Sequence, residues 1–280
     1  MKPQVGPYTE GMTVLDEILA TKRDEVTVLR RPQTRDLLRR VALDTPTPRD
    51  LAGALRRADG TVALVAELKR RSPSKGDLAP DLDPAPTAKA FAAGGAAALS
   101  VLTDNAYFGG TVADLQAAHE AVEIPILRKD FTIDEVQVYE ARAIGADAIL
   151  LIAAALPDDS LLADLHALGS ELGLAVLVEA HDEAEITRAS AAGAQIIGVN
   201  SRDLTTFSEN LDGAAVLADL IPPATIAVAE SSIRSAADAA RMAAAGFDAI
   251  LVGEALVRAS DPTQLARDLT SARVTRRSAS

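Results

Sequence analysis

Apolar residues along this chain follow two alternating patterns. From residue 61 onward, short apolar runs rich in β-branched residues are followed by longer alanine-rich stretches with helical spacing. The short runs predict strands at 62–67, 97–102, 125–129, 147–152, 174–179, 195–200, 225–230 and 248–252. The longer stretches predict helices near 85–94, 111–122, 134–144, 158–172, 182–192, 211–220, 235–245 and 261–271. Repeated strand-then-helix units predict a parallel sheet.

A weak internal repeat supports this prediction. Glycine follows four of the predicted helices, just before an apolar strand, at Gly95, Gly145, Gly193 and Gly246. Glycine just past a helix commonly caps it in a left-handed conformation. Eight such units over about 210 residues predict an α/β fold of the (β/α)8 TIM-barrel type. An open doubly wound sheet is the alternative, but no Gly-x-Gly-x-x-Gly follows the first strand.

The beginning of the chain lacks the strand–helix alternation. Residues 14–29 have the spacing of an amphipathic helix, and a second helical pattern covers 46–57, with Thr47 or Asp50 near its start. We expect both to belong to a helical extension packed on one end of the barrel. The predicted division is an N-terminal extension over 1–46, a barrel domain over 47–272 and a frayed tail over 273–280.

Composition narrows the possible functions. The 280 residues are 48% hydrophobic, enough for a large core, and contain no Cys, which excludes disulfides, thiol nucleophiles and Cys-zinc sites. The net charge of −12 argues against a general nucleic-acid surface. No apolar run approaches a membrane span and no signal-peptide pattern opens the chain. We therefore expect a cytoplasmic protein with no nucleic-acid or membrane partner, as a monomer or weak homodimer.

Polar side chains gather at the predicted strand ends, where a barrel of this type carries its chemistry. Glu67 and Lys69 alternate at the end of the first strand, so both point to one face. A structural ion pair explains these two alone, but similar residues follow the other strands. They include Lys129, Glu179, Asn200, Arg202, Glu230, Ser231, Ser232, Gly253 and Glu254. So many charged and polar residues at one end of a barrel predict a functional site there.

The residue types indicate the chemistry. Two lysines among several carboxylates have coupled pKa values, which suits acid–base catalysis. Loops after the last two strands of a barrel often bind phosphate, here at Ser231-Ser232 and Gly253-Glu254. No motif has metal-ligand spacing. His119 and His166 fall inside predicted helices, and His181 begins a loop, so a packing or surface role is favoured for all three.

Six motifs, met in order, resemble those of the indole-3-glycerol-phosphate synthase family of tryptophan biosynthesis. The resemblance runs from about residue 14 to 258 and includes the N-terminal helix. The motifs are Glu67-Leu68-Lys69-Arg70-Arg71-Ser72-Pro73-Ser74-Lys75-Gly76, Ser100-Val101-Leu102-Thr103-Asp104 with Tyr107-Phe108, Leu127-Arg128-Lys129-Asp130-Phe131, Val178-Glu179, Gly198-Val199-Asn200-Ser201-Arg202-Asp203-Leu204 and Ala229-Glu230-Ser231.

The resemblance implies a carbon–carbon lyase that needs no cofactor or metal. Its substrate would be a phosphorylated anthranilate, 1-(o-carboxyphenylamino)-1-deoxyribulose 5-phosphate, which undergoes ring closure, decarboxylation and dehydration to indole-3-glycerol phosphate. By position, Lys129 would be the general acid for ring closure, and Lys69 would lie by the anthranilate carboxylate and act in the dehydration. Glu179 would be the base, with Glu67 its rival.

The remaining residues would bind and orient the substrate. Asn200, Arg202 and Glu230 would orient hydroxyls and the lysines. The phosphate would be held by Ser72, Ser231, Ser232 and the Gly253-Glu254 region, and the aromatic ring would face Phe108 and Phe131.

One position departs from the family pattern, because Ser232 stands where the family usually has Gly. We expect its backbone to occupy an ordinary region and its hydroxyl to contact phosphate; strain at positive φ is the alternative. Two other functions stay open. A phosphoribosylanthranilate isomerase-like enzyme would need a catalytic Cys that this chain lacks. A non-catalytic sugar-phosphate-binding barrel would not need the acid–base residues.

Overall fold

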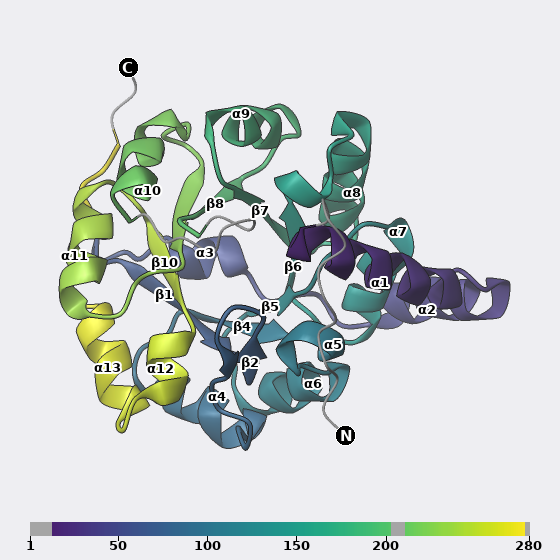
Figure 1. Ribbon diagram of the computed structural model, residues 1–280, viewed down its shortest axis with the longest axis horizontal. Coiled ribbons are helices and arrows are strands. Elements are labelled where there is room, and N and C mark those ends of the chain that lie inside the picture. Colours follow the sequence, from purple (N-terminus) through teal and green to yellow (C-terminus); the bar gives the residue numbers. More distant parts are fainter. Residues whose placement is uncertain (1–12, 203–210, 278–280) are drawn as a thin grey trace.

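Eight parallel strands close into a barrel in the computed structural model, which describes residues 13–202 and 211–277 (Figure 1). Each strand pairs with its neighbours in chain order, and the first pairs with the last. The TIM-barrel prediction is therefore confirmed. The strands are β1 (Ala63–Leu68), β4 (Ala98–Leu102), β5 (Ile126–Lys129), β6 (Ala148–Ile152), β7 (Ala175–Ala180), β8 (Ile196–Asn200), β9 (Ile226–Glu230) and β10 (Ala249–Val252).

Alternate residues of each strand face two different cores. In β1, Ala63 and Val65 pack inside the barrel, whereas Leu64 and Ala66 pack outward against the helices. The interior carries mostly Val, Leu, Ile and Ala, as the scarcity of aromatic residues requires. The same two-residue period sends Glu67 of β1, Glu179 of β7 and Glu230 of β9 inward, toward the mouth.

Helices surround the barrel, one after each strand, and most begin at an Asp, Ser or Thr side chain that caps their free N–H groups. The four glycines of the internal repeat all have positive φ, from 87° to 95°, as predicted. The surrounding helices are α4 (Pro84–Ala93), α6 (Val112–Ala121), α7 (Glu135–Ala143), α8 (Asp159–Glu171), α9 (Glu183–Ala191), α10 (Leu211–Leu217) with the 3-10 turn η2 (Ala218–Leu220), α11 (Ala236–Ala244) and α13 (Pro262–Leu269).

The N-terminal extension contains a helix that we did not predict. The predicted first helix is α1 (Val14–Leu29), and α2 (Pro32–Asp44) follows it to form a hairpin beside α7 (Figure 1). Only Ala42 of α2 is buried, although Leu37, Leu38 and Val41 share its helical spacing. The helix expected at 46–57 is shorter, α3 (Leu51–Leu55), capped by Asp50.

Several short elements lie in segments predicted as loops. Residues after β1 form a hairpin of β2 (Arg71–Ser72) and β3 (Gly76–Asp77). Single turns α5 (Asn105–Phe108), η1 (Ala153–Ala155) and α12 (Glu254–Arg258) follow β4, β6 and β10. They are too short for a periodic pattern, so the sequence carried no clear signal for them.

The C-terminal tail, where we expected fraying, makes contacts with the barrel as far as it is described. The backbone N–H of Val274 donates to Gly60 O at 2.9 Å, and that of Thr275 donates to Ala243 O at 2.9 Å. The Arg277 guanidinium contacts Asp248 at 3.2 Å. Residues 278–280 lie outside the described part of the chain.

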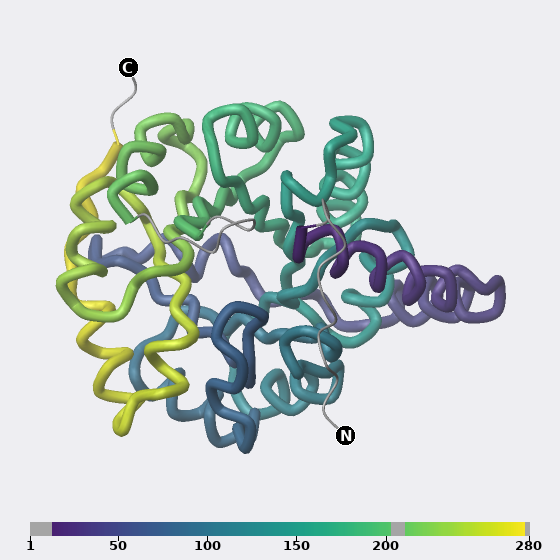
Figure 2. Tube along the Cα trace, viewed as in Figure 1, coloured from purple at the N-terminus to yellow at the C-terminus, as the bar shows by residue number. Residues whose placement is uncertain are grey.

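The extension reaches the functional end of the barrel. In the chain trace, α1 begins at one edge of the barrel and runs outward over α7 (Figure 2), and its residues Val14, Leu15 and Ile18 line the same pocket as Ser72 of the β2–β3 hairpin. In the described ranges, no helix is long and apolar enough to span a bilayer.

Candidate active site

One pocket opens at the carboxyl ends of the strands. It encloses about 1150 Å³ of empty volume, part of it open to solvent, enough for a small-molecule ligand. Every residue that the sequence pattern singled out for catalysis or binding lines it: Glu67, Lys69, Ser72, Phe108, Lys129, Phe131, Glu179, Asn200, Arg202, Glu230, Ser231, Ser232, Gly253 and Glu254. The structure thus brings the predicted residues together, while their individual roles remain predictions.

The Lys129 ammonium lies at the centre of this pocket among three carboxyl groups. Its Nζ is 3.2 Å from Glu230, 3.3 Å from Glu179 and 3.9 Å from Glu67. The three acids are 2–3% exposed. They arrive from β1, β7 and β9, so only barrel closure brings them to one lysine. Asp130, the next residue, contacts Arg128 at 3.3 Å and Lys22 at 2.9 Å.

Burial and charge set the protonation states. Burial acts to lower the pKa of Lys129, but the three carboxylates outweigh it and raise that pKa, so the side chain stays an ammonium. Burial together with the neighbouring Glu179 raises the pKa of Glu230 to about 8, although Lys129 acts against the shift. Burial acts to raise the pKa of Glu179 as well, but Lys129 prevails and lowers it. Glu230 therefore carries a proton next to an ionised Glu179.

Glu67 forms a second charged pair at the mouth. Its Oε1 lies 2.5 Å from Lys69 Nζ, as the shared strand face predicts. Burial acts to raise the pKa of Glu67, but Lys69 and Lys129 together lower it, so this carboxylate is ionised. With Glu230 protonated, two ammonium groups balance two carboxylates across the mouth.

Hydrogen bonds between neighbouring strands fix the orientation of Glu179. Asn200 Nδ2 donates to Glu179 Oε1 at 3.0 Å, and Asn200 Oδ1 accepts from Ser231 Oγ at 2.7 Å. The β8–β9 register places Asn200 directly beside Glu230. Asn200 thus locks one acid and links it to the loop after β9.

Two glycines leave space for the carboxyl groups. A Cβ at Gly198 would lie 2.1 Å from Glu230 Oε1, and one at Gly253 would lie 2.5 Å from Glu67 Oε1. Neither contact is possible without movement of the acid. The absence of a side chain at these positions is therefore a requirement of the site.

The serine pair after β9 corrects one expectation. Ser231 and Ser232 have φ of 66° and 61°, so the prediction of an ordinary backbone for Ser232 is wrong. The left-handed region costs an L-residue roughly 1–2 kcal/mol. Hydrogen bonds offset part of this cost, because Ser201 Oγ donates to Ser232 Oγ at 2.8 Å and Ser231 donates to Asn200.

The rim of the pocket is polar and basic. Lys75 bonds Glu254 at 2.8 Å, and Arg202 donates to Ser74 at 3.2 Å, so β8 and β10 are both linked to the loop after β1. The Ser72 hydroxyl is buried and has no hydrogen-bond partner within the described residues. A ligand with acceptor oxygens would satisfy it.

Two phenylalanines, Phe108 and Phe131, form what we call the aromatic wall. Their ring centroids are 6.1 Å apart and the rings are tilted by 37°. This spacing is typical of favourable aromatic pairs. Both rings line the same pocket as the acids and lysines, so an aromatic ligand with polar groups fits the arrangement.

Some lining residues were missed from the sequence. Arg234 lies in the pocket two positions after the serine pair, and a basic residue beside a candidate phosphate loop was a usable signal. Val14, Leu15 and Ile18 also line it, but their helical spacing alone could not place them at the mouth. His181 lies outside this lining, 3.1 Å from Glu185 and 3.7 Å from Glu179.

Comparison with known proteins agrees with this geometry. A sequence model of the family described as "Indole-3-glycerol phosphate synthase" matches residues 15–269. The chain belongs to the indole-3-glycerol phosphate synthase family. A relative with that name from Nocardioides sp. strain JS614 is 49% identical over 259 residues, covering 92% of this chain and 98% of the relative. Another, from Laribacter hongkongensis, is 48% identical over 252 residues, covering 89% and 95%.

Solved structures of other families share the fold alone. A 3-hexulose-6-phosphate synthase aligns with a TM-score of 0.62 at 17% identity, covering 76% of this chain and all of that one. The thiamine phosphate pyrophosphorylase of Pyrococcus furiosus aligns with a TM-score of 0.56 at 19% identity, covering 74% and 93%. At these identities the likeness extends to the barrel and no further.

The protonated Glu230 gives a pH prediction. Its pKa in the folded protein lies above the ordinary value, so the stabilisation is full below about pH 4.5 and is lost as pH rises through about 8. Between pH 5 and 8, wild-type protein should lose on the order of 3 kcal/mol of unfolding free energy relative to Glu230→Gln, measured by urea denaturation.

The control is Glu254→Gln at the rim. Burial acts to raise the pKa of Glu254, but Lys75 lowers it overall, so its titration falls below this pH window. Glu254→Gln should therefore track wild type. A constant difference between Glu230→Gln and wild type from pH 5 to 8 would show that Glu230 is ionised throughout.

Proposed function

We propose that this protein converts 1-(o-carboxyphenylamino)-1-deoxyribulose 5-phosphate to indole-3-glycerol phosphate. The observation that carries the proposal is the Lys129 ammonium held by Glu67, Glu179 and Glu230 inside a pocket with an aromatic wall. Family membership supports the substrate, and the charged cluster supports acid–base chemistry without a cofactor or metal.

Ring closure comes first in this scheme. The aromatic carbon that bears the carboxylate attacks the ketone carbon, a carbon–carbon bond forms, and the carbonyl oxygen takes a proton from Lys129. An ammonium fixed in a desolvated mouth stabilises the negative charge that develops on this oxygen. Carbon dioxide then leaves, and its bonding electrons restore the aromatic ring.

Dehydration completes the reaction. The new hydroxyl leaves as water with a proton from Lys69, while Glu179 removes the proton from the adjacent ring carbon; Glu67 is the alternative base. The lysines give two protons and the carboxylate receives one, so each turnover takes up one proton from solvent. That balance matches the conversion of a carboxylate to carbon dioxide.

The remaining residues bind the substrate. Ser72, Ser231, Ser232 and the backbone at Gly253 and Glu254 would hold the phosphate. Ser232 Oγ lies 2.8 Å from Ser201 Oγ, which keeps the Ser232 hydroxyl in place beside this group. Arg202 and Arg234 supply positive charge against the net −12 of the chain, and the aromatic wall takes the anthranilate ring.

Other parts of the proposal follow from the reaction. The enzyme would be a carboxy-lyase of tryptophan biosynthesis, acting in the cytoplasm on a small-molecule substrate. We propose a monomer or a weak homodimer, with neither nucleic acid nor membrane as a partner.

The direct test mixes purified protein with this substrate and follows indole fluorescence and carbon dioxide release. The chain has no Trp, so the protein contributes little background. Formation of both products supports the proposal. Tight binding without either product would contradict it and favour a non-catalytic sugar-phosphate-binding barrel; rearrangement without carbon dioxide would indicate an isomerase.

Lys129 is the first residue to test. Lys129→Met should lower kcat by at least about 10²-fold, the usual scale for a general acid. Lys89→Met, on the exposed face of α4, is the matched control and should leave kcat unchanged. Stopped-flow fluorescence in single turnover measures both. Near-normal turnover by the Lys129 variant would remove this residue from the chemistry.

Gly198 tests whether the position of Glu230 matters. Gly198→Ala should push the Glu230 carboxyl away from Lys129 and lower kcat by about 10²-fold, since a displacement near 1 Å can cost that much. Gly169→Ala is the control, because its Cβ meets Val176 at 2.8 Å far from the mouth. That variant should lose thermal stability but keep kcat. Equal kcat losses in both variants would mean that the effect is general destabilisation.

A further inference from the structure

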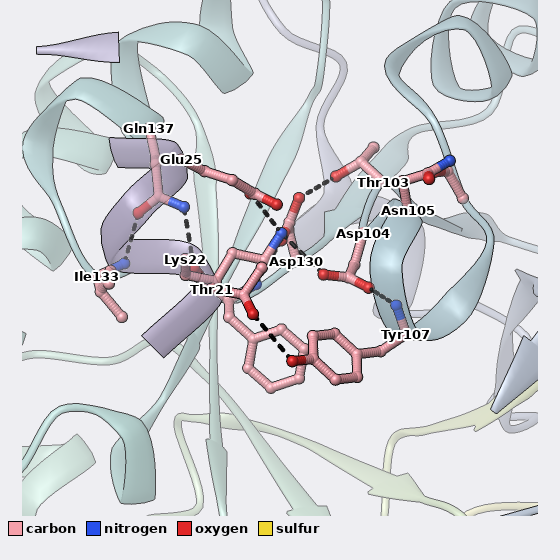
Figure 3. Close-up of polar contacts among 12 residues, drawn as sticks. Thr21, Lys22, Glu25, Thr103, Asp104, Asn105, Tyr107, Asp130, Ile133 and Gln137 are labelled. Atoms are coloured by element: carbon pink, nitrogen blue, oxygen red, sulfur yellow. Dashed lines mark hydrogen bonds and ion pairs between the residues drawn. The ribbon is translucent and has the colours of Figure 1, made fainter. Parts of the chain in front are cut away.

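A second buried lysine lies outside the catalytic pocket and has no role in the chemistry described above. Lys22 of α1 is 1% exposed. Its ammonium is 2.9 Å from Asp104 and 2.9 Å from Asp130, which are 0% and 4% exposed, and 2.8 Å from the more exposed Glu25 (Figure 3). A fully buried lysine is rare unless it is paired, so this arrangement calls for a reason.

Each of the two buried aspartates holds part of the aromatic wall. Asp104 Oδ1 accepts the backbone N–H of Tyr107 at 2.7 Å and of Phe108 at 3.2 Å, which caps α5. Asp130 Oδ1 accepts the backbone N–H of Phe131 at 2.8 Å. The ammonium of Lys22 thus joins the two carboxylates that hold the backbone of Phe108 and Phe131.

The two aspartates depend on Lys22 to different degrees. Asp130 also contacts Arg128 at 3.3 Å and the Thr103 hydroxyl, so it keeps a positive neighbour without Lys22. Asp104 Oδ2 has only the Lys22 ammonium as a polar contact in the described part of the chain. Loss of the ammonium would leave a buried carboxylate uncompensated at the cap of α5, and the Phe108 side of the wall would move.

We infer that Lys22 is a positioning residue for substrate binding, which sets the aromatic wall by neutralising Asp104 and Asp130. The inference rests on the proposed function for the identity of the ligand. This role differs from simply holding α1 against the barrel, since other contacts of α1 already do that. Ile18, Leu19 and Val26 are buried, and Thr21 bonds the Tyr107 hydroxyl at 2.9 Å (Figure 3).

The test measures two ligand fragments separately. Lys22→Met keeps the length of the side chain and removes its charge. It should weaken binding of anthranilate, measured by calorimetry, by about tenfold or more, because the uncompensated Asp104 distorts the wall. Binding of inorganic phosphate should change less than about twofold, because its proposed ligands follow β1, β9 and β10 and, among the described residues, contact neither Asp104 nor Asp130. With the full substrate, KM should rise by about tenfold while kcat stays within about threefold.

Two further variants make the result specific. Glu25 is the third partner of Lys22 and does not contact the aromatic wall. Glu25→Gln removes its charge, and this variant should bind anthranilate like wild type. Lys22→Met combined with Asp104→Asn removes both charges and keeps a good helix cap, so it should recover most of the anthranilate affinity.

Three outcomes would overturn the inference: equal loss of anthranilate and phosphate binding, a lower melting temperature with unchanged KM, or no recovery in the double variant. If wild-type protein binds neither fragment and forms no indole, the proposed function fails instead. If the Lys22→Met protein does not fold, a double variant that folds and binds anthranilate supports the inference, and a double variant that also fails to fold overturns it.

Discussion

The site depends on electrical neutrality around a desolvated ammonium. Lys129 can remain charged at the barrel mouth only with carboxylates beside it, and too many ionised acids would in turn repel one another. One proton on Glu230 resolves this conflict, because two ammonium groups then face two carboxylates. The glycines at 198 and 253 follow from the same constraint, since they give the acids room to approach.

A second buried lysine balances buried carboxylates next to the aromatic wall. Lys22 supplies the positive charge that lets Asp104 and Asp130 be buried where they hold backbone N–H groups. The N-terminal extension therefore contributes charge as well as apolar surface to the mouth. In the proposed scheme, proton transfer would depend on Lys129 and its three acids, and the shape of the ligand site on Lys22 and its two aspartates. The two groups of charged residues are joined through the chain itself, because Asp130 directly follows Lys129.

The barrel fold and most residues at its mouth were predictable from the sequence, for physical reasons. The strand period of two residues fixes which side chains face inward, so the alternation of Glu67 with Lys69 was enough to assign both to the mouth. Helix α2 was missed but was predictable, because its apolar residues Leu37, Leu38, Val41 and Ala42 have helical spacing. The left-handed backbone of Ser232 was missed because hydrogen bonds to neighbouring strands, absent from local sequence, stabilise it. The Lys22 cluster joins residues about eighty to one hundred positions apart, beyond any local pattern.

The proposed chemistry requires an ammonium on Lys129 beside a protonated Glu230 and an ionised Glu179 near neutral pH. Neutron diffraction from deuterated crystals at pH 7 locates these protons directly. We expect three deuterons on Lys129 Nζ and one deuteron between Glu179 and Glu230. A neutral amine on Lys129, or no deuteron on either carboxyl group, would contradict this assignment.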